Sequence, residues 1–194
     1  MKIRKVIDIC VKTGSVDLRT GADTDCQWIG NGAAFYAFYG LPHLTADNVI
    51  PVFDIPEECA NMIRMNGVAP LMLCENYHGE VACERDMVAS RYAPDGLIPF
   101  HTSNGLVFIQ QKYLQPFGKD KQLFFFERGG YIAVKEGITL RAVIAPIMVI
   151  TREYIDGLTD YLLKCEITAH NILSARDPEQ IDLNDETEDE NENN

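Results

Sequence analysis

The strongest pattern of apolar and polar positions lies near the end of the chain. Between residues 138 and 150, apolar side chains occupy alternate positions, and after Arg141 the opposite face turns apolar as well. A strand that is apolar on both faces is buried on both faces or passes beneath a helix. Pro146 cannot donate a backbone hydrogen bond, so it should lie at a bulge, at an edge or where the strand ends.

A long helix is expected directly after this strand. Its apolar residues recur at the three- and four-residue spacing of one helix face. The face consists of Ile155, Leu158, Leu162, Cys165 and Ile172. Thr151 is placed to act as the N-cap. We therefore expect a helix from Thr151 to about Leu173 that lies across the sheet.

Short apolar runs separated by turn residues predict strands over much of the remaining chain. Gly30-Asn31-Gly32 separates two apolar runs and Asn104-Gly105 separates two more, so a hairpin is expected at each position. Residues 2–12 alternate apolar with charged positions. Further strand segments are expected at 16–19, 68–74, 97–100, 106–109, 122–127 and 131–134.

Two short helices are expected between the hairpins. Thr45 is placed to cap one helical turn over residues 46–50. Asp54 and Glu57 have the spacing of a capping box, which predicts a second helix over residues 56–64.

These elements predict a single α+β domain over residues 1–177. Its antiparallel-rich sheet or sheets would be covered by the one long C-terminal helix. The order of strand, Asn/Gly turn, strand, Pro-containing segment and strand occurs at 16–55 and again at 97–128, so a duplicated β-rich unit is possible.

Charge is distributed unevenly along the 194 residues. The whole chain carries a net charge of −12, but residues 178–194 hold eight acidic residues and no Lys or Arg. That leaves 21 acidic and 17 basic residues, a net charge of −4, on residues 1–177. Such a balance argues against DNA binding through a broad basic surface.

The acidic segment 178–194 predicts a disordered tail, because a run of like charges with few apolar residues cannot offset the entropy lost on ordering. It either keeps the protein soluble or docks on a basic partner in competition with nucleic acid. The candidate partner-binding residues in the tail are Asp182, Asp185, Glu186, Glu188, Asp189 and Glu190.

The sequence gives no sign of export or membrane insertion. The N-terminal residues lack the apolar core of a signal peptide. The longest uninterrupted apolar run, residues 142–150, is less than half the length of a membrane-spanning helix. Six cysteines in such a chain should be reduced thiols without a structural disulfide, so a cytoplasmic location is expected.

Candidate chemistry is sparse. Cys59, Cys74, His78 and Cys83 offer four metal-binding side chains, but their spacing departs from the tight pairs of structural zinc sites. We therefore favour unrelated, partly buried thiols over a zinc site, because a free Cys packs as a small apolar residue. No nucleophile elbow or complete phosphate-binding loop is found, and no cofactor is expected. The aromatic residues of segment 35–39 have no interleaved Arg or Lys, so we interpret them as core.

A resemblance supplies a biological context. The chain is similar to small uncharacterised proteins encoded by bacteriophages and prophages, through Gln27-Trp28-Ile29-x-x-Gly32-Ala33-Ala34-Phe35-Tyr36, Gly40-Leu41-Pro42, Phe53-Asp54-Ile55 and Ala133-Val134-Lys135-Glu136-Gly137. It implies a phage gene product in the bacterial cytoplasm that acts in phage DNA metabolism or against a host system. The resemblance transfers no site residues.

These observations favour a non-enzymatic interaction protein that binds a bacterial or phage protein partner. In its narrower form, the acidic protein mimics DNA and occupies the basic groove of a host defence nuclease, as anti-CRISPR proteins do. The alternatives are an accessory factor in phage DNA replication or recombination, which recruits other proteins, and a small enzyme with an unrecognised Cys/His site. Direct nucleic-acid binding is less favoured, and the oligomeric state is left open.

Overall fold

The computed structural model describes residues 1–21, 26–75, 77–118, 121–147 and 152–175. The chain divides after Val149 into two units, Met1–Val149 and Ile150–Asn194, and each is described by itself. The first unit holds both sheets and the second holds the C-terminal helix. The expected α+β class is confirmed. The expectation of one domain over residues 1–177 stays a prediction.

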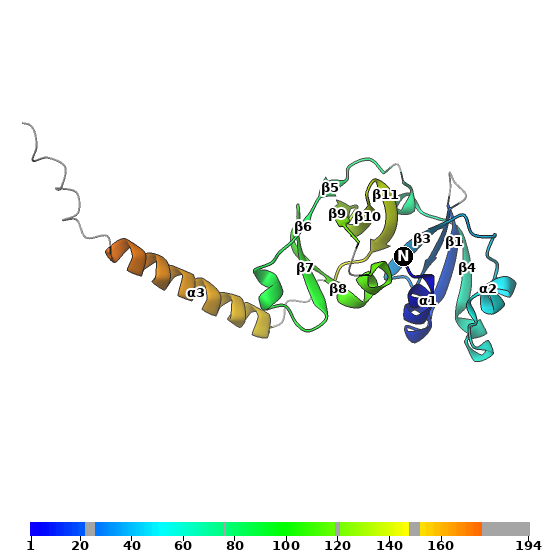
Figure 1. Cartoon of the computed structure of the whole chain (residues 1–194), viewed down its shortest axis with the longest axis horizontal. Coiled ribbons are helices and arrows are strands. Elements are labelled where there is room, and N and C mark those ends of the chain that lie inside the picture. The colour runs from blue at the N-terminus through cyan, green and yellow to red at the C-terminus, as the bar shows by residue number, and fades with distance from the viewer. Residues whose placement is uncertain (22–25, 76, 119–120, 148–151, 176–194) are drawn as a thin grey trace, which may run out of the picture. The chain divides into compact units, whose positions relative to one another are not determined.

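An eight-stranded sheet forms most of the first unit (Figure 1). Its strand order is β4-β1-β2-β3-β11-β10-β9-β5, and every described pair except parallel β1–β4 is antiparallel. The strands are β1 Val16–Thr20, β2 Cys26–Gly30, β3 Ala34–Tyr39, β4 Ile63–Val68, β5 Val81–Ala82, β9 Leu123–Arg128, β10 Tyr131–Glu136 and β11 Thr139–Ile144. Strand β11 ends before Pro146, as its missing N–H group predicts.

A second sheet of three strands has the order β6-β7-β8. Its strands are β6 Glu84–Arg85, β7 Leu97–Thr102 and β8 Gly105–Gln110, and the turn between β7 and β8 lies at the predicted hairpin. The sheet contacts the larger one through Phe100, whose ring centroid lies 4.7 Å from that of Phe125 in β9. The expected repeat is not matched strand for strand, because β7 and β8 lie in a different sheet from β9.

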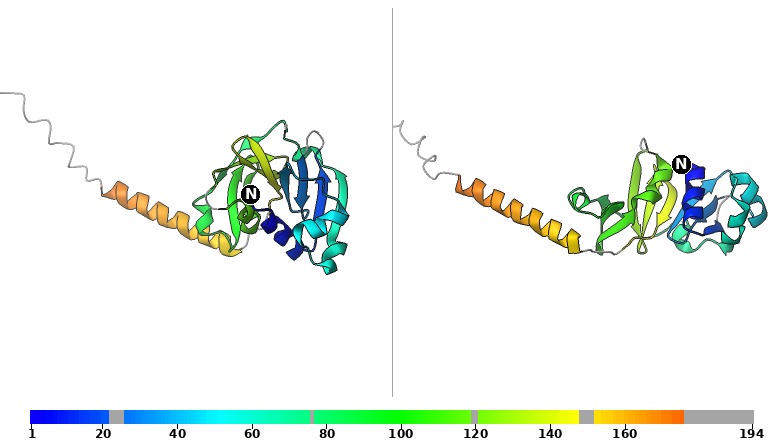
Figure 2. Two further views of the ribbon diagram at one scale, coloured as in Figure 1. Left: turned by 45° about the vertical axis from the view of Figure 1, so that its right-hand side comes forward. Right: turned by 90° about the horizontal axis from the view of Figure 1, so that it is seen from below.

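Two α-helices and four 3-10 helices complete the described part of the first unit. They are α1 Ile3–Lys12, α2 Ala46–Phe53, η1 Glu57–Met62, η2 Leu71–Leu73, η3 Ala89–Arg91 and η4 Gln111–Phe117. Helix α1 lies against strands β1–β3 (Figure 2). Its apolar residues point to the sheet at helical spacing, with Val6, Ile7, Ile9 and Cys10 all buried.

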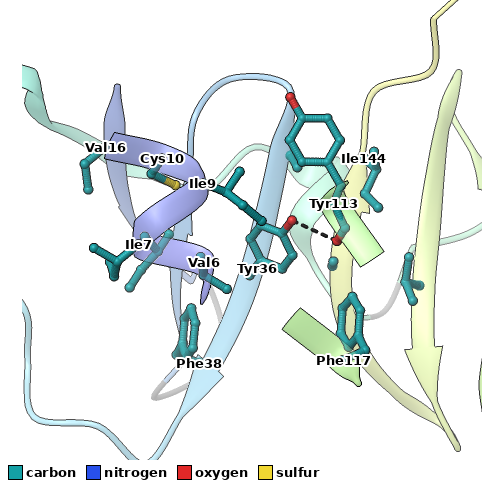
Figure 3. Packing of buried hydrophobic residues seen from close by; sticks show 14 of the residues in the cluster. Val6, Ile7, Ile9, Cys10, Val16, Tyr36, Phe38, Tyr113, Phe117 and Ile144 are labelled. Atoms are coloured by element: carbon teal, nitrogen blue, oxygen red, sulfur yellow. Dashed lines mark hydrogen bonds between the residues drawn. The ribbon is translucent and has the colours of Figure 1, made fainter. Parts of the chain in front are cut away.

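The main core lies between the large sheet and the elements on the α1 side. Figure 3 shows Val6 and Ile9 of α1 next to Tyr36 and Phe38 of β3, with Tyr113 and Phe117 of η4 nearby. The buried hydroxyl of Tyr36 donates to the carbonyl oxygen of Tyr113 at 2.9 Å. This hydrogen bond satisfies a polar group that burial would otherwise penalise.

The opposite face of the sheet carries a smaller apolar cluster around Trp28, Ala133 and Val143. Ala69 and Leu73, from the segment after β4, are buried in the same cluster. The segment that covers this face therefore contains only the short 3-10 helix η2 between Ala69 and Leu73.

The predicted C-terminal helix is present as α3, Arg152–Ser174. Its proposed cap Thr151 lies outside the described residues, and so does the acidic tail. Most of the predicted apolar stripe is exposed, including Ile155, Leu162 and Ile172. That the helix lies across the sheet thus stays a prediction. No helix of the described residues has the length and apolar character needed to cross a membrane.

Two local predictions are wrong. Asp54 is not the N-cap of the second helix: it is the C-cap of α2, in the left-handed conformation at φ 52°, and η1 begins after Pro56 without a side-chain cap. The strand expected at 68–74 instead comes earlier, as β4, and is followed by η2. The Thr45 cap is confirmed, because its side chain accepts from the backbone N–H of Asn48 and the Asn48 side chain accepts from that of Thr45.

Candidate binding pocket

Cations and aromatic rings gather on the face of the large sheet opposite α1. Residues paired across neighbouring strands point to the same side. The register pairs Arg19 with Trp28, and Phe35 with Val143. Three half-buried rings on this face each meet a cation from another strand: Arg19 lies 5.0 Å from the ring centre of Phe35, Lys135 lies 4.7 Å from that of Phe126, and Arg141 lies 5.8 Å from that of Tyr39.

The turn between β2 and β3 fixes the position of the Phe35 ring. Asn31 Oδ1 accepts from the backbone N–H groups of Ala33 and Ala34 at 3.1 and 3.0 Å. Gly30 leaves room for the ring, because a Cβ atom there would lie 2.5 Å from Phe35 Cδ1. Any larger residue at position 30 must displace the ring or the turn.

A pocket of about 220 Å³ opens beside this ring. Its wall is mainly apolar, with a single charged side chain. The lining residues are Arg19, Gly32, Ala33, Phe35, Pro70, Met72, Leu73, Tyr131 and Val143. Apolar walls with few placed polar groups are typical of ligand sites, although this volume lies below the usual range of about 300–1,000 Å³. It suits a single side chain or a very small molecule.

Arg19 is the charged group of the pocket. Its Nη2 atom pairs with Asp17 Oδ2 at 3.2 Å, and Asp17 Oδ1 also accepts from Asn66. The Arg19 side chain is 24% exposed, but its Nε atom is buried without an acceptor among the described residues. A buried donor without an acceptor costs about 1–3 kcal/mol. An incoming oxygen atom would therefore be favoured at Nε.

The segment that closes the pocket on one side is held by Arg128 of β9. Its guanidinium is fully buried and donates to the carbonyl oxygens of Met72 and Cys74 at 2.9 and 2.6 Å. The same guanidinium pairs with Glu80, which also pairs with Lys135. This network ties Met72, Cys74 and Glu80 to β9 and β10 and so places Met72 in the pocket wall.

A second group of polar contacts holds Glu75 near β3. Tyr39 donates to the carbonyl oxygen of Leu140 at 3.3 Å and lies 3.4 Å from Glu75 Oε2. Burial, with the nearby thiol of Cys26 and carboxylate of Glu75, raises the pKa of the Tyr39 hydroxyl. Burial likewise raises the pKa of the Cys26 thiol. Both groups are thus neutral near pH 7.

The metal-binding hypothesis gains no geometric support in the described part of the chain. Cys59 and Cys83 are buried in the main core, whereas Cys74 lies in the segment over the opposite face. Among the described residues, no three His, Cys, Asp or Glu side chains are grouped as a metal site. All six cysteines are free thiols.

The remaining functional residues are of two kinds: tail candidates that the structure does not describe, and cations that the sequence analysis did not identify. The tail candidates Asp182, Asp185, Glu186, Glu188, Asp189 and Glu190 lie outside the described residues. Arg19, Lys135 and Arg141 were missed as aromatic partners, because they come from other strands than segment 35–39. The alternation of polar and apolar residues in 16–20 is the one sequence signal that could have placed Arg19 on a sheet face.

Comparisons with protein-family models, with curated proteins and with solved structures found no match to this chain.

Proposed function

We propose that the protein is a non-enzymatic interaction protein that binds a bacterial or phage protein partner in the cytoplasm. The Arg19 pocket receives one apolar side chain of that partner, and an adjacent carbonyl or carboxylate oxygen accepts from Arg19 Nε. The buried Nε–H group without an acceptor is the observation that supports this function most directly.

The lining chemistry favours binding over catalysis. General acid–base or nucleophilic catalysis needs convergent His, Cys, Lys or carboxylate groups. The pocket offers one guanidinium and the Tyr131 phenol among apolar side chains. A wall of this kind can recognise the shape of an apolar group and one hydrogen-bond acceptor beside it.

Charge pairing on this face favours a protein partner over nucleic acid. Arg19 pairs with Asp17, Lys135 with Glu80, and Arg141 with Glu136. Cations already paired with carboxylates contribute little to phosphate binding, which depends on release of counterions by unpaired Lys and Arg. The rings of Phe35, Tyr39 and Phe126 are also faced by these cations, which limits stacking with bases.

The test compares capture of a partner from nuclease-treated bacterial lysate by three versions of the full chain. Arg19→Gln removes the charge and the Nε donor. Arg64→Gln is the matched control, because Arg64 is an exposed cation on the neighbouring strand β4. One protein should be retained by the wild type and by Arg64→Gln, and should be at least tenfold depleted with Arg19→Gln. Equal capture by all three, or capture abolished by nuclease, would refute the pocket hypothesis.

The narrower proposal, an acidic inhibitor that occupies a basic groove, is tested separately. A chain truncated after residue 177 loses all eight acidic residues of the tail. If the tail mimics DNA, truncation should weaken capture and reduce its dependence on salt, because exposed charges are screened within about 8 Å at 0.15 M. An unchanged salt dependence removes Asp182 to Glu190 from the mechanism but leaves the pocket hypothesis intact.

A further inference from the structure

Helix α3 carries a seam of apolar residues at the spacing of a coiled coil. The seam alternates three- and four-residue steps without interruption through Ile155, Leu158, Leu162, Cys165, Ala169 and Ile172. Its central Leu162 is 64% exposed. Exposed seams of this kind are buried when a second helix supplies matching side chains.

Side-chain size along the seam selects an antiparallel second copy of the same helix. The seam is symmetric about the point midway between Leu162 and Cys165. An antiparallel copy therefore pairs Leu162 with Cys165 of the second copy, and Leu158 with Ala169 of the second copy. Each of these layers combines a large side chain with a small one, which fills space as interdigitating cores require.

A parallel copy would fill space poorly. It would place Cys165 against Cys165 and Ala169 against Ala169 of the second copy, and such small–small layers leave voids. Voids in an apolar interface are costly, because the lining atoms lose their contacts. The same seam is thus better matched to the antiparallel arrangement.

The distribution of charge also favours the antiparallel orientation. The positions that flank the seam include Thr159, Tyr161, Glu166 and Thr168, of which only Glu166 is charged, so the charges that matter lie in the segment after the helix. Residues 178–194, which follow the helix, hold eight acidic residues and no basic ones. A parallel pair would bring these two segments together. An antiparallel pair separates the ends of the 23-residue helices by about 34 Å, well beyond the screening length of about 8 Å.

We propose that α3 self-associates as an antiparallel two-helix coiled coil that joins two copies of this chain. The dimer presents two Arg19 pockets, one in each copy, and does not depend on what the pockets bind. Three heptads form a short coil, so the association depends on protein concentration.

Sedimentation velocity of the full chain between 1 and 200 µM tests the association. Leu162→Glu places a charge in the seam, whereas Leu163→Glu is the matched control one residue away and off the seam. Leu163 is 54% exposed, so it tolerates the same substitution. The wild type and Leu163→Glu should dimerise alike, and Leu162→Glu should raise the dissociation constant at least 100-fold. Near-ultraviolet circular dichroism checks that the fold around Trp28 is unchanged.

Two outcomes would overturn the association. One is a monomer at every concentration for the wild type, above all if Leu162→Glu also lowers the unfolding midpoint, because the seam would then cover the chain's own surface. The other is an equal effect of the two substitutions, because the seam would not be the interface.

Disulfide crosslinking under a mild oxidant tests the orientation. In the antiparallel pair Cys165 faces Leu162 of the second copy, so Leu162→Cys should give a covalent dimer and the wild type should not. Adding Cys165→Ser to Leu162→Cys should abolish that crosslink. Rapid crosslinking of the wild type through Cys165, or a crosslink that survives Cys165→Ser, would show a parallel pair and overturn the proposed orientation.

Discussion

The carboxylate of Glu80 accepts from the Nε–H of Arg128 at 2.7 Å, although the Arg128 side chain is completely buried. Glu80 lies in the segment between η2 and β5, and Arg128 ends β9. The pair joins the residues just before β5 to the end of β9. Tyr77 adds to this link, because its ring centre lies 5.0 Å from the guanidinium carbon of Arg128.

Removing the charge of Glu80 should destabilise the fold strongly. Glu80→Gln leaves the buried Arg128 without its counterion, and breaking a buried ion pair in this way costs about 3–5 kcal/mol. Urea unfolding followed by Trp28 fluorescence measures the loss. The control is Glu84→Gln, an exposed residue of β6, which should change the free energy of unfolding by less than about 0.5 kcal/mol. Equal effects would contradict the anchoring role.

The Arg19 pocket should bind a small aromatic acid. Benzoate offers a ring for the wall formed by Phe35 and Val143 and a carboxylate for Arg19 Nε, and charge-assisted hydrogen bonds of this type are strong. Titration at millimolar concentrations should shift the Nε–H resonance of Arg19 saturably, while that of Arg64 stays unchanged. Benzyl alcohol, which has the ring without the charge, should bind more weakly. Equal shifts at Arg19 and Arg64 would indicate nonspecific binding.

The cysteines should differ widely in their rates of alkylation. Burial, with a smaller contribution from Asp17, raises the pKa of Cys10 to about 12, and burial with Glu127 raises the pKa of Cys83 to about 11. Since the thiolate is the reactive form, both should resist iodoacetamide at pH 8, while Cys165, which is exposed in the single chain, reacts at protein concentrations below those at which α3 associates. Mass spectrometry of the labelled peptides measures the rates. In guanidinium chloride all rates should converge, and fast native labelling of Cys10 would contradict its burial.

Glu127 should titrate below the ordinary range of a glutamate. Hydrogen bonds from Ser103, supported by Asn104 at the β7–β8 turn, lower the pKa of its carboxyl group. Because the folded-state pKa is lowered, the stabilisation is present above the ordinary glutamate pKa and is lost as pH falls through the lowered value. The amide resonance of Ser103 should report this transition by NMR, and Glu127→Gln should abolish it. A midpoint at or above the ordinary value would contradict the hydrogen bonds.

Local sequence determined those elements whose backbone geometry depends on a few neighbouring residues. Turn residues with positive φ, such as Gly32 and Gly105, placed both hairpins. Thr45 placed the start of α2, and apolar spacing placed α3. The sequence-based predictions were wrong where two local signals competed for the same residue. Asp54 and Glu57 fit a capping box, but Asp54 was needed to end α2 in the left-handed conformation.

The candidate pocket could not be predicted from the sequence. Its walls come from β1, the β2–β3 turn, β3, the segment after β4, β10 and β11, several of which are far apart along the chain. Only the strand order and register bring Arg19 over Phe35, and only the buried Arg128 holds Met72 beside them. Sequence therefore determined the individual strands and helices, because their signals act over a few residues. Tertiary structure decided which cation meets which ring, because strand pairing and burial join residues more than 100 positions apart.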